Sequence, residues 1–279
     1  MKKISRRSFL AAAGLSVAAL ALTACGGSSS SVASSVASSA ASSEAASTSA
    51  AAGELTTVEA GKLTMATNAT FPPYEMTTDA GEFEGIDIET AQAIADKLGL
   101  ELQIDDMDFD AALLSVQQGK ADIVMAGVTV TDERKAVMDF SDSYATGIQS
   151  IIVPNDSDIA SPDDLAGKTI GTQRGTTGYI YCSDDFGDEN VVAYDDGLTA
   201  VQALNNGQVD AVVIDNAPAQ EFVAANPGLK VLDTSYAEED YAIGMAKGSA
   251  LEDAVNKALE ELKADGTLQA IVDKYINAN

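Results

Sequence analysis

The chain has 279 residues, of which 43 are acidic and 16 basic, so its formal net charge at pH 7 is −27. So negative a protein repels phosphate backbones and anionic lipid headgroups, which excludes nucleic acid as a natural partner. The sequence contains no histidine, so a catalytic cysteine would lack its usual base, and we expect neither a metal nor a cofactor.

The first residues have the features of a bacterial export signal. Basic residues are followed by an apolar stretch at 9–22 that is too short to span a membrane and ends in small residues. The tetrapeptide Leu-Thr-Ala-Cys at 22–25 resembles the bacterial lipobox, in which the cysteine is diacylated and becomes the new N-terminus. The Arg-Arg pair at 6–7 resembles a twin-arginine signal, with an ordinary secretory signal as the alternative. We expect a signal peptide at 1–24 and an extracytoplasmic protein that is anchored to the cell membrane by a lipid at Cys25.

A stretch of low complexity follows the signal. From residue 28 to residue 52 nearly every residue is serine or alanine, which cannot bury enough apolar surface to fold. We therefore predict a disordered tether at 25–53. The second cysteine of the chain is Cys182, and because Cys25 is taken by lipid, no intramolecular disulfide can form. Cys182 is expected to be a small buried hydrophobic residue.

The remaining part, roughly 225 residues, is long enough for two small α/β domains. Its first half alternates strands and helices. Periodicity and turn residues predict a strand at 62–67, a proline-containing loop at 68–75, a helix at 86–98 ended by Gly99, a strand at 100–104, a helix from 109 that ends at Gly119, and an apolar strand at 123–126. This β-α-β-α-β order indicates parallel strands joined by right-handed crossovers.

Residues that suit a carboxylate follow the apolar strand. Gly127 has no Cβ, so a ligand can approach the backbone at the carboxyl end of a strand, where open α/β sheets bind ligands. Thr129 carries a hydroxyl, and Arg134 lies one turn inside a short helix that begins near Asp132. The planar guanidinium of arginine matches a carboxylate in a bidentate manner. The stretch predicts a receptor for a small carboxylate; the alternative is that Arg134 merely pairs with Asp132 or Asp139 on the surface.

The second half repeats the alternation. The pattern predicts a strand at 148–153, a short capped helix at 161–165, a strand at 169–172, a loop at 175–178 that leads into a helix, a strand at 191–194, a helix at 198–204, a strand at 209–214 that ends in Asp215, strands at 230–232 and 241–246, and amphipathic helices at 251–264 and 267–275. The two last helices are expected to pack back on the first half.

One unit of the chain recurs. A helix, a glycine stop, an aspartate and a buried strand follow one another twice, and aligning Gly119 with Gly207 gives a spacing of 88 residues. This repeat indicates two similarly built lobes. We place lobe I at 54–146 and 242–279 and lobe II at 147–241, with crossings near 144–148 and 239–243 that together form a two-stranded hinge.

Two charged residues follow the repeated strands. A free amino acid presents a carboxylate and an ammonium group, so its receptor needs a cation and an anion that face one crevice. Arg134 of lobe I and Asp215 of lobe II meet this demand, with Thr129, Thr176 and Thr177 as auxiliary donors. The aromatic rings of Phe71 and Phe109, on loops at strand ends, could sandwich the ligand's aliphatic stem. The alternatives are that both rings cap the core and that the threonines at 176 and 177 cap a helix.

Seven short motifs lie along the expected domain. They are Thr-Asn-Ala-Thr-Phe-Pro-Pro-Tyr-Glu at 67–75, Gly-Ile-Asp-Ile-Glu at 85–89, Asp-Phe-Asp at 108–110, Ala-Gly-Val-Thr-Val-Thr-Asp-Glu-Arg at 126–134, Asp-Phe-Ser at 139–141, Gly-Thr-Thr at 175–177 and Val-Asp-Ala-Val-Val-Ile-Asp at 209–215. Together they resemble the polar amino-acid substrate-binding proteins of ABC importers, and the match runs in register from about Gly61 to Tyr275, nearly the whole expected domain. The resemblance implies an α/β fold of the type II periplasmic-binding-protein class: a two-lobed clamshell with a two-stranded hinge.

The resemblance also implies a role for each site residue. Arg134 binds the ligand carboxylate, Asp215 binds the α-ammonium group, and the remaining residues assist one of three tasks. Thr129, Gly127, Thr177 and Thr176 aid carboxylate binding; Phe71 and Phe109 stack on the ligand; Asn68, Tyr74 and Gln173 complete the side-chain pocket. Basic-amino-acid and glutamine binders of this family often carry aspartate at the position of Asn68, and some members carry lysine at that of Gln173. These departures argue against a lysine or arginine ligand.

The expected function follows from these roles. We expect a monomeric, non-enzymatic lipoprotein that captures a free, polar amino acid and delivers it to the permease of an ABC importer. Two alternatives remain: a ligand-sensing surface lipoprotein without transport, and a dehydratase on the same scaffold that uses Glu75 as an acid. The second lacks a convergent acid or a histidine near Glu75.

Overall fold

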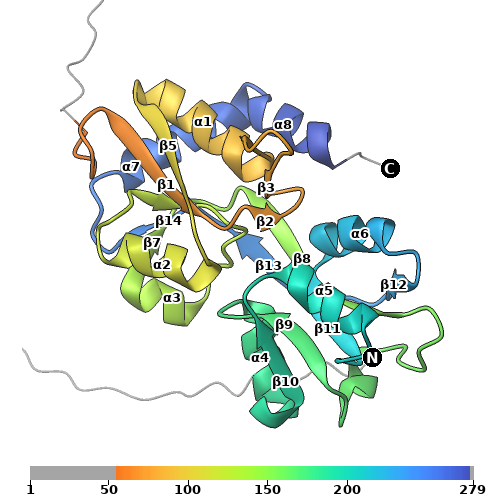
Figure 1. Ribbon diagram of the computed structural model, residues 1–279. Helices are drawn as coiled ribbons and strands as arrows, with labels where there is room; N and C mark the ends of the chain where they lie inside the picture. The colour runs from red at the N-terminus through yellow and green to blue at the C-terminus, as the bar shows by residue number, and fades with distance from the viewer. Residues whose placement is uncertain (1–54, 277–279) are drawn as a thin grey trace, which may run out of the picture. The chain divides into compact units, whose positions relative to one another are not determined.

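The computed structural model describes residues 55–276, so the predicted signal peptide at 1–24, the tether at 25–53 and Cys25 lie outside the described residues. Two main sheets carry the fold (Figure 1). The first has the order β5 (Glu101–Asp106), β1 (Lys62–Thr67), β6 (Ile123–Val124), β14 (Gly244–Ala246) and β7 (Met138–Phe140). The second has the order β10 (Val191–Tyr194), β9 (Ile170–Gln173), β11 (Ala211–Asp215), β8 (Ala145–Pro154) and β12 (Leu229–Val231). A small sheet joins β2 (Thr70–Phe71), β3 (Glu75–Thr77) and β4 (Phe83–Glu84).

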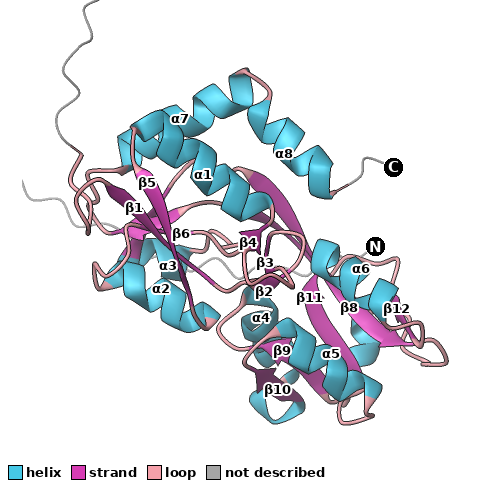
Figure 2. Cartoon of the chain, turned by 45° about the horizontal axis from the view of Figure 1, so that its top comes forward, coloured by secondary structure: helices cyan, strands magenta, loops and turns pink. Residues whose placement is uncertain are grey.

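Helices cover the sheets, and all except the short α3 bury apolar residues, as expected of amphipathic helices. They are α1 (Ile86–Leu98), α2 (Phe109–Gln117), α3 (Asp132–Val137), α4 (Thr177–Phe186), α5 (Gly197–Asn205), α6 (Asn216–Ala225), α7 (Glu252–Ala264) and α8 (Thr267–Tyr275), with short 3₁₀ turns η1 (Pro162–Leu165) and η2 (Asp188–Asn190). Helices α7 and α8 lie beside α1 on one side of the first sheet (Figure 2), which confirms that the C-terminal helices pack back on the first half. Cys182 is buried in the core of the second half, as predicted, and burial raises the pKa of its thiol to about 12.

The predicted parallel unit is present in the first sheet. Strand β1 pairs with β5 and with β6 in the parallel sense, and α1 and α2 connect them. Helix α1 ends where predicted, because Gly99 adopts a left-handed conformation with φ of 70° and its N–H caps the last turn.

The sequence repeat corresponds to a repeated structural device. Gly119 and Gly207 both have positive φ, at 66° and 68°. The aspartate three residues further on then fastens the neighbouring parallel strand: Asp122 accepts a hydrogen bond from the Thr64 N–H at 2.8 Å, and Asp210 accepts one from the Thr169 N–H at 2.8 Å. The two halves are therefore built on the same plan.

The chain passes between the two sheets through paired strands. Strand β13 (Ala237–Tyr241) runs antiparallel to β8, with Glu239 opposite Gly147 and Tyr241 opposite Ala145. The two predicted crossings therefore lie side by side. The division into lobes at residues 146 and 241 remains a prediction.

Several elements differ from the prediction. The short strands β2, β3, β4 and β7 were not predicted, and two differences concern longer elements. The strand predicted at 241–246 is two strands, because β13 ends at Tyr241 and β14 joins the other sheet. The stretch 241–246 is apolar because it is buried at the end of β13 as well as in β14. The apolar pattern therefore does not reveal where one strand ends and the next begins. Helix α6 was missed, although Asp215 caps it and Pro218 lies in its first turn, where proline is tolerated.

Candidate functional site

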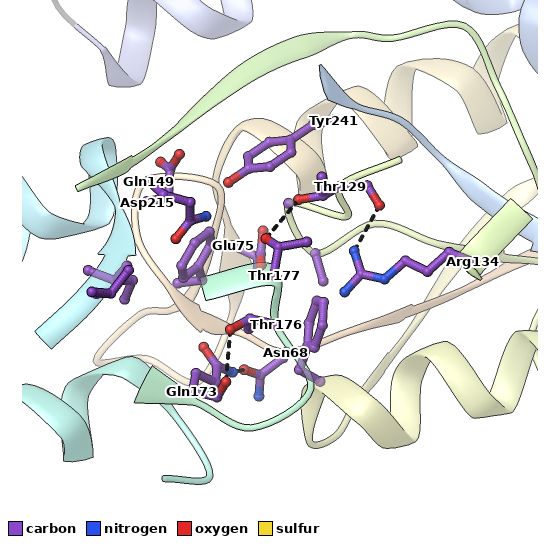
Figure 3. A pocket seen from close by; sticks show the side chains of 16 residues that line it. Asn68, Glu75, Thr129, Arg134, Gln149, Gln173, Thr176, Thr177, Asp215 and Tyr241 are labelled. Atoms are coloured by element: carbon purple, nitrogen blue, oxygen red, sulfur yellow. Dashed lines mark hydrogen bonds between the residues drawn. The ribbon is translucent and has the colours of Figure 1, made fainter. Parts of the chain in front are cut away.

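A pocket with a cavity volume of about 30 Å³ lies between strand ends of the two main sheets (Figure 3). Ten of the predicted pocket residues line it: Asn68, Phe71, Phe109, Gly127, Thr129, Arg134, Gln173, Thr176, Thr177 and Asp215. Six further residues line it that the sequence did not assign to ligand binding: Glu75, Ala126, Gln149, Val213, Ile214 and Tyr241. Arg134 and Asp215 lie on opposite sides of the pocket, as predicted (Figure 3).

Arg134 is a buried cation whose acceptors are backbone carbonyls. Thr131 caps α3 and accepts the Arg134 N–H, which fixes the start of the side chain. The guanidinium donates to the carbonyl of Thr129 at 2.8 Å and to that of Gly175 at 3.1 Å, and it lies 5.4 Å from the ring centre of Phe109. Burial lowers the pKa of Arg134, but a guanidinium stays protonated in proteins.

The surface ion pair considered for Arg134 is absent. Asp139 pairs instead with Lys247, 2.6 Å away, and no carboxylate among residues 55–276 lies within salt-bridge distance of Arg134. A buried cation without an ion-pair partner is costly, and the guanidinium of Arg134 is turned toward the pocket that it lines (Figure 3). The side chain is therefore prepared for an anion.

Asp215 is the buried anion on the opposite side. It ends β11 and caps α6, accepting hydrogen bonds from Ala217 N–H at 3.1 Å and Ile148 N–H at 2.7 Å. Burial raises the pKa of the Asp215 carboxyl to about 6, while the two backbone donors hold it down. The group is mostly ionised at neutral pH and would be stabilised further by a cation in the pocket.

Two more buried carboxyls, Glu75 and Asp87, lie next to one another, so the expectation that no second acid lies near Glu75 was wrong. Glu75 lines the pocket, and within residues 55–276 no N–H donates to either of its oxygens. Asp87 lies within hydrogen-bonding reach of Glu75, a contact that requires one of the two carboxyls to be protonated. Asp87 also accepts from the Gly127 N–H at 3.0 Å and the Tyr144 hydroxyl at 2.8 Å. Burial raises the pKa of both carboxyls, that of Asp87 to about 6.

Gly127 is required by its surroundings. Its φ is 55°, and a Cβ added to it would lie 3.0 Å from Cε1 of Phe71 and 3.3 Å from Cε2 of Tyr241. The backbone therefore approaches both rings closely, while the approach of a ligand to Gly127 stays a prediction.

The aromatic residues take different places. Phe71 and Phe109 line the pocket. Tyr74 does not line this pocket. It is buried, its ring stacks on that of Phe71 with 5.8 Å between ring centres, and it forms a T-shaped pair with Tyr241 at 5.4 Å. The sequence Phe-Pro-Pro-Tyr at 71–74 does not reveal which of the two rings lines the pocket and which is buried in the core.

Gln173 and Thr176, two polar residues from the second half that line the pocket, already have hydrogen-bond partners. Gln173 donates from Nε2 to Oδ1 of Asn68 at 2.8 Å, which joins a residue after β1 to the end of β9. The Thr176 hydroxyl accepts the Tyr179 N–H and donates to the Gln173 carbonyl, so the predicted helix-capping role is confirmed for this threonine.

Glu239 was not identified from the sequence as a site residue. It lies on β13 and is buried, and its Oε2 accepts the hydroxyls of Thr129 and Thr177 and the side-chain amide of Gln149, each at 3.0 Å. The sequence offers little signal for it, because Glu238, Glu239 and Asp240 are consecutive acids of which one turns inward.

Three comparisons relate the chain to characterised proteins. A family model described as bacterial extracellular solute-binding proteins, family 3, matches residues 63–278. The L-cystine-binding protein TcyJ of Escherichia coli (strain K12) is 34% identical over 225 residues, which are 79% of this chain and 85% of the relative. The arginine-, lysine-, histidine-binding protein ArtJ of Geobacillus stearothermophilus has a TM-score of 0.75 and 34% identity, over 78% of this chain and 96% of that one. An ancestral arginine-binding protein bound to glutamine has a TM-score of 0.74 and 42% identity, over 77% of this chain and 98% of that one.

Proposed function

The chain belongs to the bacterial extracellular solute-binding proteins of family 3, and from this premise we propose that it captures a free amino acid and delivers it to an ABC importer. Its fold is the two-lobed type II periplasmic-binding fold of its structural neighbours. Relatives named for binding cystine, arginine, histidine and glutamine support an amino acid as the ligand. The proposal includes no turnover: the protein binds and releases its ligand unchanged.

The observation that carries this proposal is the pair of opposite charges across one pocket. The guanidinium of Arg134 has donors left over and no ion-pair partner within the described residues, and Asp215 is buried with its charge unpaired by any cation. A zwitterion supplies the missing partner to each side chain at once. We assign the ligand carboxylate to Arg134 and its ammonium group to Asp215.

Glu75 narrows the class of ligand. Its carboxyl lines the pocket, no N–H among residues 55–276 donates to it, and an unsatisfied buried acceptor costs roughly 1–3 kcal/mol. A ligand side chain that ends in N–H donors would satisfy it. We therefore propose an amino acid such as arginine or glutamine, whose stem passes between Phe71 and Phe109. The asparagine at 68 argues against arginine, but the carboxyl of Glu75 in the same pocket offers an acceptor for the guanidinium of an arginine ligand.

The anchoring and the motion belong to the same proposal. Donors and acceptors from both halves face the pocket, so a ligand that bridges them favours the closed arrangement of the halves over an open one. None of the helices at 55–276 is long and apolar enough to cross a membrane. The proposed attachment is the lipid at Cys25.

A calorimetric screen tests the proposed function. The purified domain from Gly53 onward would be titrated with the free amino acids one by one. The D-enantiomers and the Nα-acetylated derivatives of the best ligands serve as controls. We expect micromolar or tighter binding of one or a few L-amino acids with N–H donors in the side chain, and weaker binding of acetylated forms, which lack the ammonium charge. Absence of binding to every amino acid would contradict the proposal. Binding limited to short aliphatic amino acids would contradict the role of Glu75.

A further inference from the structure

Glu239 connects the two halves at the pocket. Its Oε2 receives the hydroxyl of Thr129, which follows β6 of the first sheet, and the hydroxyl of Thr177, the first residue of α4 beside the second sheet. Gln149 of β8 donates to the same oxygen. Its other oxygen, Oε1, is buried and has no hydrogen-bond partner among the described residues.

The hydroxyl groups can give their protons only once. A threonine hydroxyl has one O–H donor and two acceptor lone pairs. The two hydroxyl oxygens also lie 3.4 Å from each other, but each is closer, at 3.0 Å, to Oε2 of Glu239. Both hydroxyls direct their proton at Glu239, since a charge-assisted hydrogen bond is stronger than one to a neutral hydroxyl. Thr129 and Thr177 therefore present lone pairs, and not protons, toward any group that enters the pocket.

A ligand's two ends respond to this arrangement in opposite ways. The carboxylate accepts hydrogen bonds only, so it finds no donor in these hydroxyls and relies on Arg134 and on the backbone N–H of Thr177, which has no partner within its helix. The ammonium group donates three hydrogen bonds, so it can use the lone pairs as well as Asp215.

We propose that Glu239 is a positioning residue that makes the ligand site selective for an ammonium group, because it binds the hydroxyl protons of Thr129 and Thr177 and leaves these hydroxyls as acceptors. The inference rests on the proposed function, in which the ligand is an amino acid. It also changes the role that the sequence suggested for the two hydroxyls, from carboxylate donors to ammonium acceptors.

The test is the preference of the protein for an amino acid over the same molecule without its amino group. L-Arginine and 5-guanidinopentanoic acid form such a pair, and L-glutamine with its des-amino analogue forms a second pair for use if glutamine binds better. The dissociation constants of both members would be measured by calorimetry for the wild type, Glu239→Ala and Glu239→Gln. The quotient of the two constants is the preference.

The two variants separate the acceptor from the charge. In Glu239→Ala no acceptor holds the hydroxyl protons, so the hydroxyls become free to donate to a carboxylate, and we expect the preference to fall at least tenfold. In Glu239→Gln the amide oxygen still accepts both hydroxyls and the amide nitrogen takes the place of the unpartnered oxygen, so we expect a preference within threefold of the wild type. Thr129→Val should also lower the preference. In the double variant, Glu239→Ala should lower the preference little beyond the effect of Thr129→Val, because the two residues act through the same hydroxyl.

Each outcome separates this inference from the proposed function. A preference unchanged in Glu239→Ala, or lost equally in Glu239→Gln, would overturn the role of Glu239 while leaving amino-acid binding intact. A wild type that binds no amino acid would overturn both. Melting temperatures and circular dichroism of each variant show whether it folds, and Thr129→Val, which removes one hydroxyl without removing a charge, tests the inference if Glu239→Ala does not fold.

Discussion

The pKa of Asp215 makes a prediction about ligand affinity. The ammonium group of an amino acid needs an ionised carboxylate opposite it, and burial raises the pKa of Asp215 to about 6. The ligand's own carboxylate and ammonium groups do not titrate between pH 5 and 7. A group with a pKa of about 6 is roughly nine-tenths ionised at pH 7 and one-tenth ionised at pH 5, so affinity should fall about tenfold over this interval.

A matched variant isolates this contribution. Asp215→Asn keeps the shape and removes the titration, so its affinity should be lower at pH 7.5 and should change less with pH than that of the wild type. The raised pKa values of Glu75 and Asp87 add to the pH dependence when the ligand is cationic, and this part should survive in Asp215→Asn. The measurement is the dissociation constant at five pH values for both proteins. A wild-type dissociation constant that changes by less than threefold between pH 5 and pH 7.5 would refute the reasoning.

The same shift predicts the stability of the protein measured without ligand. Folded Asp215 holds its proton more tightly than the unfolded chain, so its stabilising contribution is full below pH 3.8 and is lost as the pH rises through about 6. The difference between the ordinary pKa of 3.8 and the folded pKa of about 6 corresponds to about 3 kcal/mol. Denaturant unfolding should therefore show a decline in the free energy of unfolding between pH 4 and 7 that is smaller in Asp215→Asn.

Three further predictions concern the backbone, the repeat and the anchor. Gly127→Ala should destabilise the fold by about 1–3 kcal/mol more than Gly99→Ala. Both glycines have positive φ, but only a Cβ at 127 meets the rings of Phe71 and Tyr241. Equal losses of the free energy of unfolding for the two variants, measured with denaturant, would contradict steric crowding at Gly127. Asp122→Ala should lower the free energy of unfolding by about 1–2 kcal/mol more than Asp210→Ala. Asp122 is buried and accepts two backbone N–H groups, while Asp210 is exposed and accepts one. A larger loss for Asp210→Ala would contradict burial as the reason. Cys25→Ser should move the protein from the membrane fraction to the soluble fraction, because stable attachment requires the two acyl chains, and a variant that stays with membranes would contradict the lipid anchor.

Much of the fold follows from local patterns in the sequence. Strand β1, helix α1 and strand β10 were predicted within a residue, because each has a clear apolar period and a glycine or charged boundary. The repeat around Gly119 and Gly207 predicted two halves of one plan, and both aspartates that follow have the same bond to a neighbouring strand. Such features depend on a few adjacent residues, which a single sequence contains.

The parts that were missed depend on tertiary context. The apolar run that ends in β14 gives no sign of the passage from one sheet to the other, because burial continues on both sides of Ala242. Tyr74 and Phe71 are both aromatic residues of one loop, and only packing against Tyr241 decides that the first turns away from the pocket. Glu239 acquires its role from donors that are 110, 90 and 62 residues distant in the chain.

The central claim is that Arg134 binds the carboxylate of a free amino acid, and one measurement tests it most directly. The affinity of the best amino acid from the screen and of the amine that lacks its carboxylate, agmatine in the case of arginine, would be measured for the wild type and for Arg134→Ala. The account predicts that the substitution weakens the amino acid by two to four decades, or roughly 3–5 kcal/mol, because its carboxylate is left buried and unpaired. The amine should be weakened much less, so that the wild-type preference for the amino acid disappears. A loss under tenfold for the amino acid, or an equal loss for both compounds, would contradict the assignment.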